Sequence, residues 1–168
     1  MLGPRELREM FGLNKYKKVT HSDGTVQFQV PKSWIEELEE DGSLVLWDEA
    51  EYSGTLRFTL LTAKKENESS PNPAVEFLGP KDPNPVLLEN NNALRYYTSN
   101  AEENGEPIKL FHYEVANYVE PKYYRLALFT FITYSAHEDK KDIQKQLKCL
   151  EQEIPKTVFS PVVQEWER

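Results

Sequence analysis

The sequence predicts an α+β protein in which a central, mostly antiparallel sheet of about six to eight strands is covered by helices. Two observations carry this prediction. Segments of alternating apolar and polar residues recur along the chain and are separated by short turn sequences, which favours antiparallel pairing. One long segment, residues 138–154, instead repeats its apolar residues at helical spacing and predicts an amphipathic helix that packs on the sheet.

The first half of the chain predicts a cap, a hairpin and two further strands. Strands are expected at residues 17–20, 25–30, 43–47 and 55–63. Residues 1–15 are expected to form a helical cap, with a short helix at 4–11. Asp23-Gly24 favours a tight hairpin turn between the first two strands. Ser33 and Glu36 have the spacing of a capping box, so a short helix is expected from residue 33 to about residue 40.

The second half predicts a connection, three long strands, the helix and a tail. Residues 69–92 are a proline-rich connection, in which Asn-Pro pairs favour helical turns at 73–78 and 85–91. The remaining elements are expected as strands at 93–98, 108–117 and 123–135, the helix at 138–154, a short edge strand at 157–159 and a tail at 161–168. Apolar residues occupy both faces of the strand at 123–135, so cover is expected on both. Trp166 suggests that the tail docks.

Length, charge and cysteine content limit the classes of protein. The chain has 168 residues, 20 basic and 28 acidic, which gives a formal charge of −8. One domain, 1–168, is expected at this length. The negative charge argues against sequence-independent binding to nucleic acid or to anionic membranes. Cys149 is the only cysteine and the first residues lack an apolar leader, so we expect a cytoplasmic protein.

Several segments within residues 17–160 resemble the PsbP-like superfamily. The segment TVQFQVP at residues 25–31, followed by Trp34, is similar to its strand-proline-tryptophan opening. The segment YRLALF at 124–129, followed by the amphipathic helix, is similar to its close. The resemblance, strongest to bacterial members of unknown function, implies a central antiparallel sheet between helices, in proteins that mostly bind other proteins and mostly lack catalysis. Some bacterial members are immunity proteins against secreted toxins, which is an analogy of fold.

Motifs for catalysis, cofactors and metals are absent from the sequence. His21, His112 and His137 are scattered without metal-ligand spacing, and a packing or surface role is favoured for His112. The seven glycines form no phosphate-binding loop, and there is no GxSxG nucleophile motif. We therefore expect no catalytic residue, no cofactor, no metal site and no enzymatic activity.

Acidic residues between Ser33 and Leu56 form the candidate partner-binding site, because no lysine or arginine interrupts them. The candidates are Glu36, Glu37, Glu40, Asp41, Asp48 and Glu49. A solvated surface is the simpler interpretation, a patch for a basic partner is the functional one, and glycosidase-like chemistry is a distant third.

Tyrosines give a second candidate surface, since seven of the nine lie between Tyr96 and Tyr134. Tyr113 and Tyr118 are candidates for partner contact, with sheet packing as the alternative. The leading hypothesis is a noncatalytic protein-binding domain, of which toxin binding in the immunity sense is one form. The alternative is a small-ligand carrier or an enzyme with a site between the proline-rich connection and the sheet. The oligomeric state is not predicted.

Overall fold

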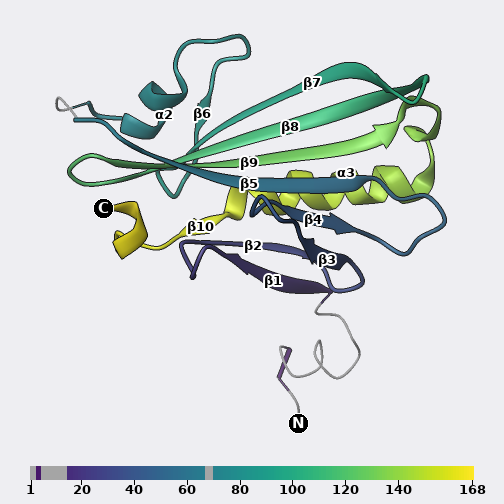
Figure 1. The fold of residues 1–168 in the computed structure, drawn as a ribbon, viewed down its shortest axis with the longest axis horizontal. Coiled ribbons are helices and arrows are strands. Elements are labelled where there is room, and N and C mark those ends of the chain that lie inside the picture. The colour runs from purple at the N-terminus through teal and green to yellow at the C-terminus, as the bar shows by residue number, and fades with distance from the viewer. Residues whose placement is uncertain (1–2, 5–14, 67–69) are drawn as a thin grey trace.

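The computed structural model describes residues 3–4, 15–66 and 70–168. Within these residues ten strands form two antiparallel sheets, one of three strands in the order β1-β2-β10 and one of seven in the order β3-β4-β5-β9-β8-β7-β6 (Figure 1). The predicted fold class is confirmed. The helix expected at 4–11 lies, beyond Pro4, outside the described residues.

The seven-stranded sheet is built around four long strands. Its members are β3 (Ile35–Leu38), β4 (Leu44–Trp47), β5 (Thr55–Lys64), β6 (Val86–Leu87), β7 (Ala93–Glu103), β8 (Glu106–Val119) and β9 (Tyr123–Tyr134). The register places aromatic residues in one row across neighbouring strands, Phe58 opposite Phe129, Phe129 opposite Tyr113 and Tyr113 opposite Tyr96. This row lies on the inner face of the sheet, which carries the main core.

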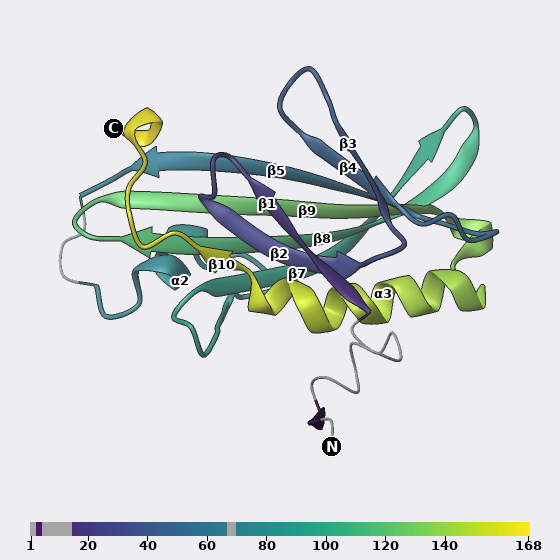
Figure 2. The ribbon, with the colours of Figure 1, turned by 90° about the horizontal axis from the view of Figure 1, so that it is seen from below.

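The inner face is covered by a small sheet and by one helix. β1 (Tyr16–His21) and β2 (Val26–Pro31) pair through a turn in which Asp23 and Gly24 have φ values of 55° and 84°, as the predicted Asp-Gly hairpin requires. β10 (Val158–Phe159) adds to β2 as the expected short edge strand. The helix α3 (Lys141–Glu153) runs beside this sheet, and Figure 2 shows both against the long strands.

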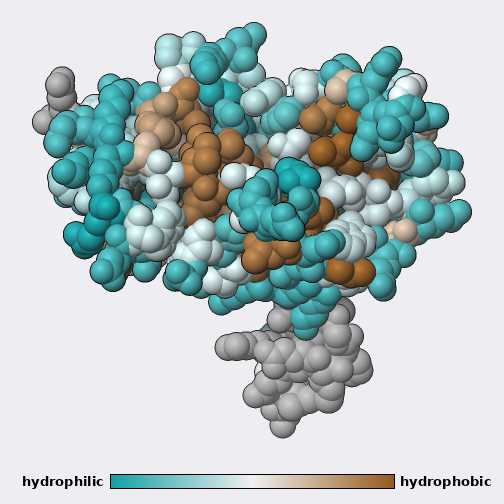
Figure 3. All heavy atoms as spheres, viewed as in Figure 1, coloured by the Kyte–Doolittle hydropathy of each residue, from teal (hydrophilic) through white to brown (hydrophobic). Residues whose placement is uncertain are grey.

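The outer face is covered at one end only. The helix α2 (Pro73–Leu78) matches the helical turn expected at 73–78, and it packs Ala74 and Leu78 on Ala93 and Ala116. Away from α2, outer-face residues of β9 such as Leu128 are only half-buried, so the cover expected on both faces is partial on this one. Figure 3 shows apolar side chains in separate patches on the side it views, divided by hydrophilic residues.

The helix expected at 33–40 is a strand, β3. Ser33 Oγ donates to Asp48 Oδ1 at 3.0 Å instead of capping a helix, and residues 35–38 pair with β4. The capping box does not form because an isolated helix of this length is marginal in water. The strand, in contrast, extends a sheet whose next strand is already buried.

The helical turn expected at 85–91 is also wrong. Val86 and Leu87 pair with Leu94 and Ala93 as β6, and the chain reverses through Asn91 at a φ of 67°. Asparagine tolerates this left-handed conformation, so the Asn-rich segment makes a hairpin where the Asn-Pro pair suggested a helix start.

Candidate functional site

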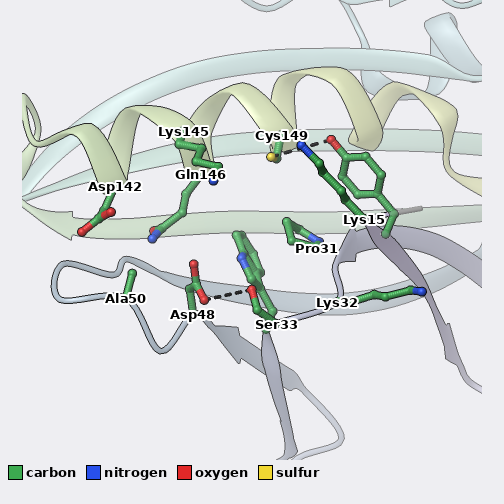
Figure 4. Close-up of a pocket in the computed structure, with 12 residues that line it drawn as sticks. Lys15, Pro31, Lys32, Ser33, Asp48, Ala50, Asp142, Lys145, Gln146 and Cys149 are labelled. Carbon is green, nitrogen blue, oxygen red and sulfur yellow. Dashed lines mark hydrogen bonds between the residues drawn. The ribbon is translucent and has the colours of Figure 1, made fainter. Parts of the chain in front are cut away.

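A cavity of about 470 Å³, here called the hairpin cavity, lies between α3 and the β1–β2 hairpin (Figure 4). Its walls come from the start of β1, the turn after β2, the loop after β4 and one side of α3. The lining residues are Lys15, Tyr16, Pro31, Lys32, Ser33, Trp34, Asp48, Ala50, Asp142, Lys145, Gln146 and Cys149. Cavities of this volume are typical of small-molecule sites.

Trp34 anchors the cavity to the core. Pro31 ends β2, and a turn closed by the Trp34 N–H to Pro31 carbonyl bond of 3.1 Å directs the side chain inward. The indole is 2% exposed and stacks on Phe131 with ring centroids 6.5 Å apart. A Cβ on Gly54 would lie 2.2 Å from the Phe131 ring, so glycine is needed at that position.

The indole N–H of Trp34 is a free donor that faces the cavity. It bonds to none of the residues that the structure describes. Every fully buried polar side-chain atom of those residues has a hydrogen-bond partner. Because this N–H has none, it cannot be fully buried, and the cavity that Trp34 borders provides its accessible surface. A donor in such a position is normally satisfied by a ligand or by water.

Tyr16 and Cys149 close the cavity between β1 and α3. The Tyr16 hydroxyl donates to Cys149 Sγ at 3.7 Å. This hydrogen bond, together with burial, raises the pKa of Tyr16 to about 12. The hydroxyl therefore keeps its proton at neutral pH, where it can hold a neighbouring group but cannot act as a base.

The two aspartates of the cavity are engaged in structural hydrogen bonds. Asp48 Oδ1 accepts from Ser33 Oγ and from the Glu49 N–H at 2.8 Å. Asp142 Oδ2 accepts from the Tyr52 N–H at 3.3 Å. Gln146, which is buried, holds the same loop by accepting from Gly54 N–H and donating to the Tyr52 carbonyl. These bonds fix the loop after β4 against α3.

The three lysines of the cavity have no such partners. Lys15, Lys32 and Lys145 are exposed, and none forms an ion pair with a described residue. Figure 4 shows Lys145 on the helix and Lys15 reaching towards Cys149, whereas the side chain of Lys32 points outward from the hairpin. Three lysines set against the carboxylates of Asp48 and Asp142 leave the lining with a net charge of +1, in a chain of charge −8, which favours an anion over a cation.

The predicted acidic residues lie on the β3–β4 hairpin, in two groups. Glu36, Glu37, Glu40 and Asp41 occupy β3 and the turn after it, and all are exposed. Asp48 and Glu49 follow β4 at the other end of the hairpin. Glu36 pairs with Leu46, two residues before Asp48, so it lies within roughly 8 Å of the second group, whereas Glu40 and Asp41 lie at the far end of the hairpin. Only Asp48 belongs to the hairpin cavity.

Two members of the first group already have protein partners. Glu36 forms a 3.2 Å ion pair with Lys17. Asp41 Oδ1 accepts from the Ser43 N–H at 2.9 Å, and hydrogen bonds from Ser43 lower the pKa of the Asp41 carboxyl. Glu37 and Glu40 have no ion pair with a described residue, so they are the carboxylates most available to a partner.

The two candidate tyrosines are not brought together. Tyr113 is 5% exposed on the inner face, where it borders a second cavity beside α3. Tyr118 points to the opposite face of the same strand, and its hydroxyl donates to the Pro121 carbonyl at 2.9 Å. They do not form a shared exposed aromatic surface.

The proline-rich connection lines none of the cavities described here. Arg95, 5% exposed, holds it to the sheet by donating to the carbonyls of Leu78, Gly79 and Pro83. Its remaining contact is a 3.2 Å ion pair with Glu114. Among the described residues, the Arg95 side chain fills part of the space between this connection and the sheet.

His112 has the packing role that its sequence context favours. Its Nε2 lies 2.8 Å from Ser99 Oγ, its Nδ1 lies 3.4 Å from Thr130 Oγ1, and the ring stacks on Tyr97. Burial lowers the pKa of the imidazole. Among the described residues, no three His, Cys, Asp or Glu side chains gather as a metal site would require.

Sequence reasoning missed most of the hairpin cavity. Trp34 was recognised only as part of a family resemblance, and Lys145 only as part of the polar side of a helix. The cavity forms because α3 meets the hairpin more than 100 positions earlier in the chain, a contact that no local pattern encodes.

Comparisons with known proteins show the fold and leave the family open. No family model and no curated protein matches the chain. A Bacteroides thetaiotaomicron crystal structure matches with a TM-score of 0.59 at 14% identity over 92% of this chain, which spans about half, 51%, of that protein. LpqN of Mycobacterium tuberculosis, involved in cell envelope biogenesis, matches with a TM-score of 0.58 at 11% identity, covering 87% of this chain and 91% of LpqN.

Both neighbours are bacterial proteins, and neither name refers to PsbP, so membership of the PsbP-like superfamily stays a prediction. Within the described part of the chain, no helix has the length and apolar character needed to cross a bilayer.

Proposed function

We propose that this protein is a noncatalytic binding domain whose hairpin cavity holds a small anionic molecule. The observation that carries the proposal is the buried Trp34 indole, whose N–H opens into the cavity without a partner among the described residues. Asp48 and Asp142 each use one carboxylate oxygen in structural hydrogen bonds, and neither accepts from the indole. The indole N–H therefore remains available to an acceptor that a ligand brings.

Binding would combine one directed hydrogen bond with less directed charge attraction. The indole N–H offers a fixed donor at the wall of the cavity, whereas the Tyr16 hydroxyl stays protonated and donates to Cys149 Sγ. The three lysines reach the rim on flexible side chains, which attract an anion without imposing one geometry. A planar carboxylate such as benzoate fits this arrangement, since its ring can lie against apolar walls.

The first test is a titration of the protein with benzoate and with inorganic phosphate. Binding is monitored through the indole N–H resonance of Trp34 in NMR spectra. The variant W47F/W166F leaves Trp34 as the single tryptophan and makes the assignment direct. We expect at least one of the two anions to shift this resonance in a saturable way. The variant K145Q should weaken that binding several-fold, because one of three ammonium groups is lost.

The matched control is K148Q, which removes an exposed lysine of α3 that does not line the cavity. It should leave the affinity within about twofold. An unmoved Trp34 resonance with both anions, or equal losses from K145Q and K148Q, would contradict the proposal.

A second candidate function is docking of a basic protein through the β3–β4 hairpin, as the acidic sequence suggests. It is favoured by the position of β3 at the edge of the seven-stranded sheet, with Leu38 67% exposed. An extended basic segment could pair with this edge and place its side chains near Glu37 and Glu40. Toxin binding in the immunity sense would be one form of this docking.

The docking candidate predicts that the variant E37K/E40K/D41K loses a partner that the unaltered protein retains from lysate of its own organism. The loss should be larger at low salt, because exposed charges are screened at high salt. The variant E102K/E103K reverses exposed charges on the β7–β8 hairpin and serves as the control. If the unaltered protein and both variants retain the same proteins, the β3–β4 hairpin is not the docking surface.

A cytoplasmic location remains part of the proposal. It is supported by Cys149, a free thiol held as a hydrogen-bond acceptor by Tyr16, which is suited to a reducing compartment.

A further inference from the structure

A second cavity, of about 510 Å³, lies on the other side of α3 and is here called the tyrosine cavity. Its walls are mainly apolar and aromatic, formed by Leu94, Tyr96, Phe111, Tyr113, Leu147 and Pro155. They come from the inner face of β7 and β8 and from the side of α3 that faces away from the β1–β2 hairpin. The cavity exists because α3 and the three-stranded sheet cover only part of the inner face of the seven-stranded sheet.

Two phenolic hydroxyls in this cavity lack protein partners. Tyr113 is 5% exposed, yet its hydroxyl bonds to none of the described residues. Every fully buried polar side-chain atom of those residues has a hydrogen-bond partner. The Tyr113 hydroxyl has none, so it must keep accessible surface, and the cavity provides it. Tyr96, whose ring lies 4.8 Å from that of Tyr113, also bonds to no described residue, but it is 44% exposed and lies at the rim. Burial is the main cause that raises the pKa of both hydroxyls, so both are donors at neutral pH.

The charge at the rim selects against anions. Glu151 borders the cavity and has no ion pair with a described residue. The nearby Lys109, whose ammonium lies 5.2 Å from the centre of the Phe111 ring, is neutralised by Glu138 at 2.6 Å. The cavity therefore combines apolar walls and hydroxyl donors with a net negative rim, the reverse of the hairpin cavity.

We propose that the tyrosine cavity binds an uncharged apolar molecule that ends in one oxygen acceptor, such as a medium-chain alcohol. The chain lies against Leu94, Leu147 and Phe111, and the oxygen accepts from Tyr113. Glu151 disfavours the fatty-acid anion of the same chain length. This inference does not depend on the anionic ligand proposed for the hairpin cavity.

The test compares octanol, octanoate and octyltrimethylammonium, which share one chain and differ in their head group. Binding is followed by the methyl resonances of Leu94 and Leu147 in NMR spectra of the full chain, with all three probes kept below their micelle-forming concentrations. We expect octanol to shift both leucines saturably and to bind more tightly than either ion. The cation offers no acceptor to Tyr113, and the anion is repelled by Glu151.

Variants test the two groups that define the ligand. Y113F removes only the hydroxyl and should weaken octanol binding about fivefold, the effect of one neutral hydrogen bond. Y118F, whose hydroxyl bonds elsewhere, is the matched control and should have no effect. E151Q should narrow the difference between octanol and octanoate.

Three outcomes would overturn the proposal. They are octanoate or octyltrimethylammonium binding at least as tightly as octanol, equal effects of Y113F and Y118F, and the absence of leucine shifts with any probe up to its solubility. Circular dichroism shows whether Y113F is less stable than the unaltered protein. If it is, Y96F, which removes the other hydroxyl of the cavity, is measured in its place.

Discussion

At the scale of single residues, Arg125 shows how one side chain orders the end of the chain. It is 0% exposed and makes five hydrogen bonds, to Asn117 Oδ1, the carbonyls of Ser160 and Val162, and both carboxylate oxygens of Glu167. The tail docks through Glu167, while Trp166, the residue that suggested docking in the sequence, is 49% exposed.

The buried pair of Arg125 and Glu167 gives a prediction on stability. Replacing Glu167 by alanine leaves the Arg125 cation buried without its charge partner. Such losses cost about 3–5 kcal/mol, and we expect a decrease of this size in the free energy of unfolding measured in urea. E165A, in the same tail but exposed, should change it by less than about 0.5 kcal/mol. A similar loss in both variants would show that Glu167 acts through the tail backbone and not through its charge.

The same pair sets a pH dependence. Burial opposes ionisation of Glu167, but hydrogen bonds from Arg125 and the Gln164 N–H outweigh it and lower the pKa of the carboxyl. Since the folded pKa lies below the unfolded value of about 4.3, this stabilisation is complete above that value. It is lost as the pH falls through the folded pKa. The difference in stability between the unaltered protein and E167A should therefore shrink in acid below about pH 4.

At the scale of elements, the sequence predicts those whose pattern is long and regular. β7, β8, β9 and α3 were each found, because their alternation or helical spacing persists over many residues and decides which face is buried. Only their ends differ: the β7–β8 hairpin extends to Asn104 and Gly105, which have positive φ values of 52° and 81°.

The two mispredicted elements are short and lie at the sheet edges. For β3 and β6, local signals at Ser33 and at Asn84-Pro85 favoured helix starts, but each segment is shorter than a stable helix and gains backbone pairing from a neighbour. The partner-binding candidates stay predictions, and the donors of the two cavities were not predicted. The acidic residues could be placed on the surface, whereas the Trp34 donor and the Tyr113 hydroxyl became visible only once α3 was packed on the sheet.

At the scale of the whole molecule, the two cavities have one cause: the seven-stranded sheet is wider than the layer that covers it. A seven-stranded sheet presents a broad inner face, and α3 with a three-stranded sheet covers only part of it. The helix divides the uncovered space, with Lys145, Gln146 and Cys149 towards one cavity and Gln144, Leu147 and Glu151 towards the other.

This arrangement predicts that ligands of the two cavities bind independently. Ile143 and Leu150 are 0% and 1% exposed, and Gln146 is bonded to the loop at Tyr52 and Gly54, so α3 cannot shift without breaking core contacts. Coupling between sites requires an element with two arrangements, and α3 is held in one. The dissociation constant of octanol, measured by NMR with and without a saturating anion in the hairpin cavity, should therefore agree within about twofold. The variant Q146A removes two of the three hydrogen bonds given above between the loop and the helix, and leaves that of Asp142, so it is the variant in which coupling should emerge. Coupling of tenfold in the unaltered protein would instead show that α3 moves as the cavities fill.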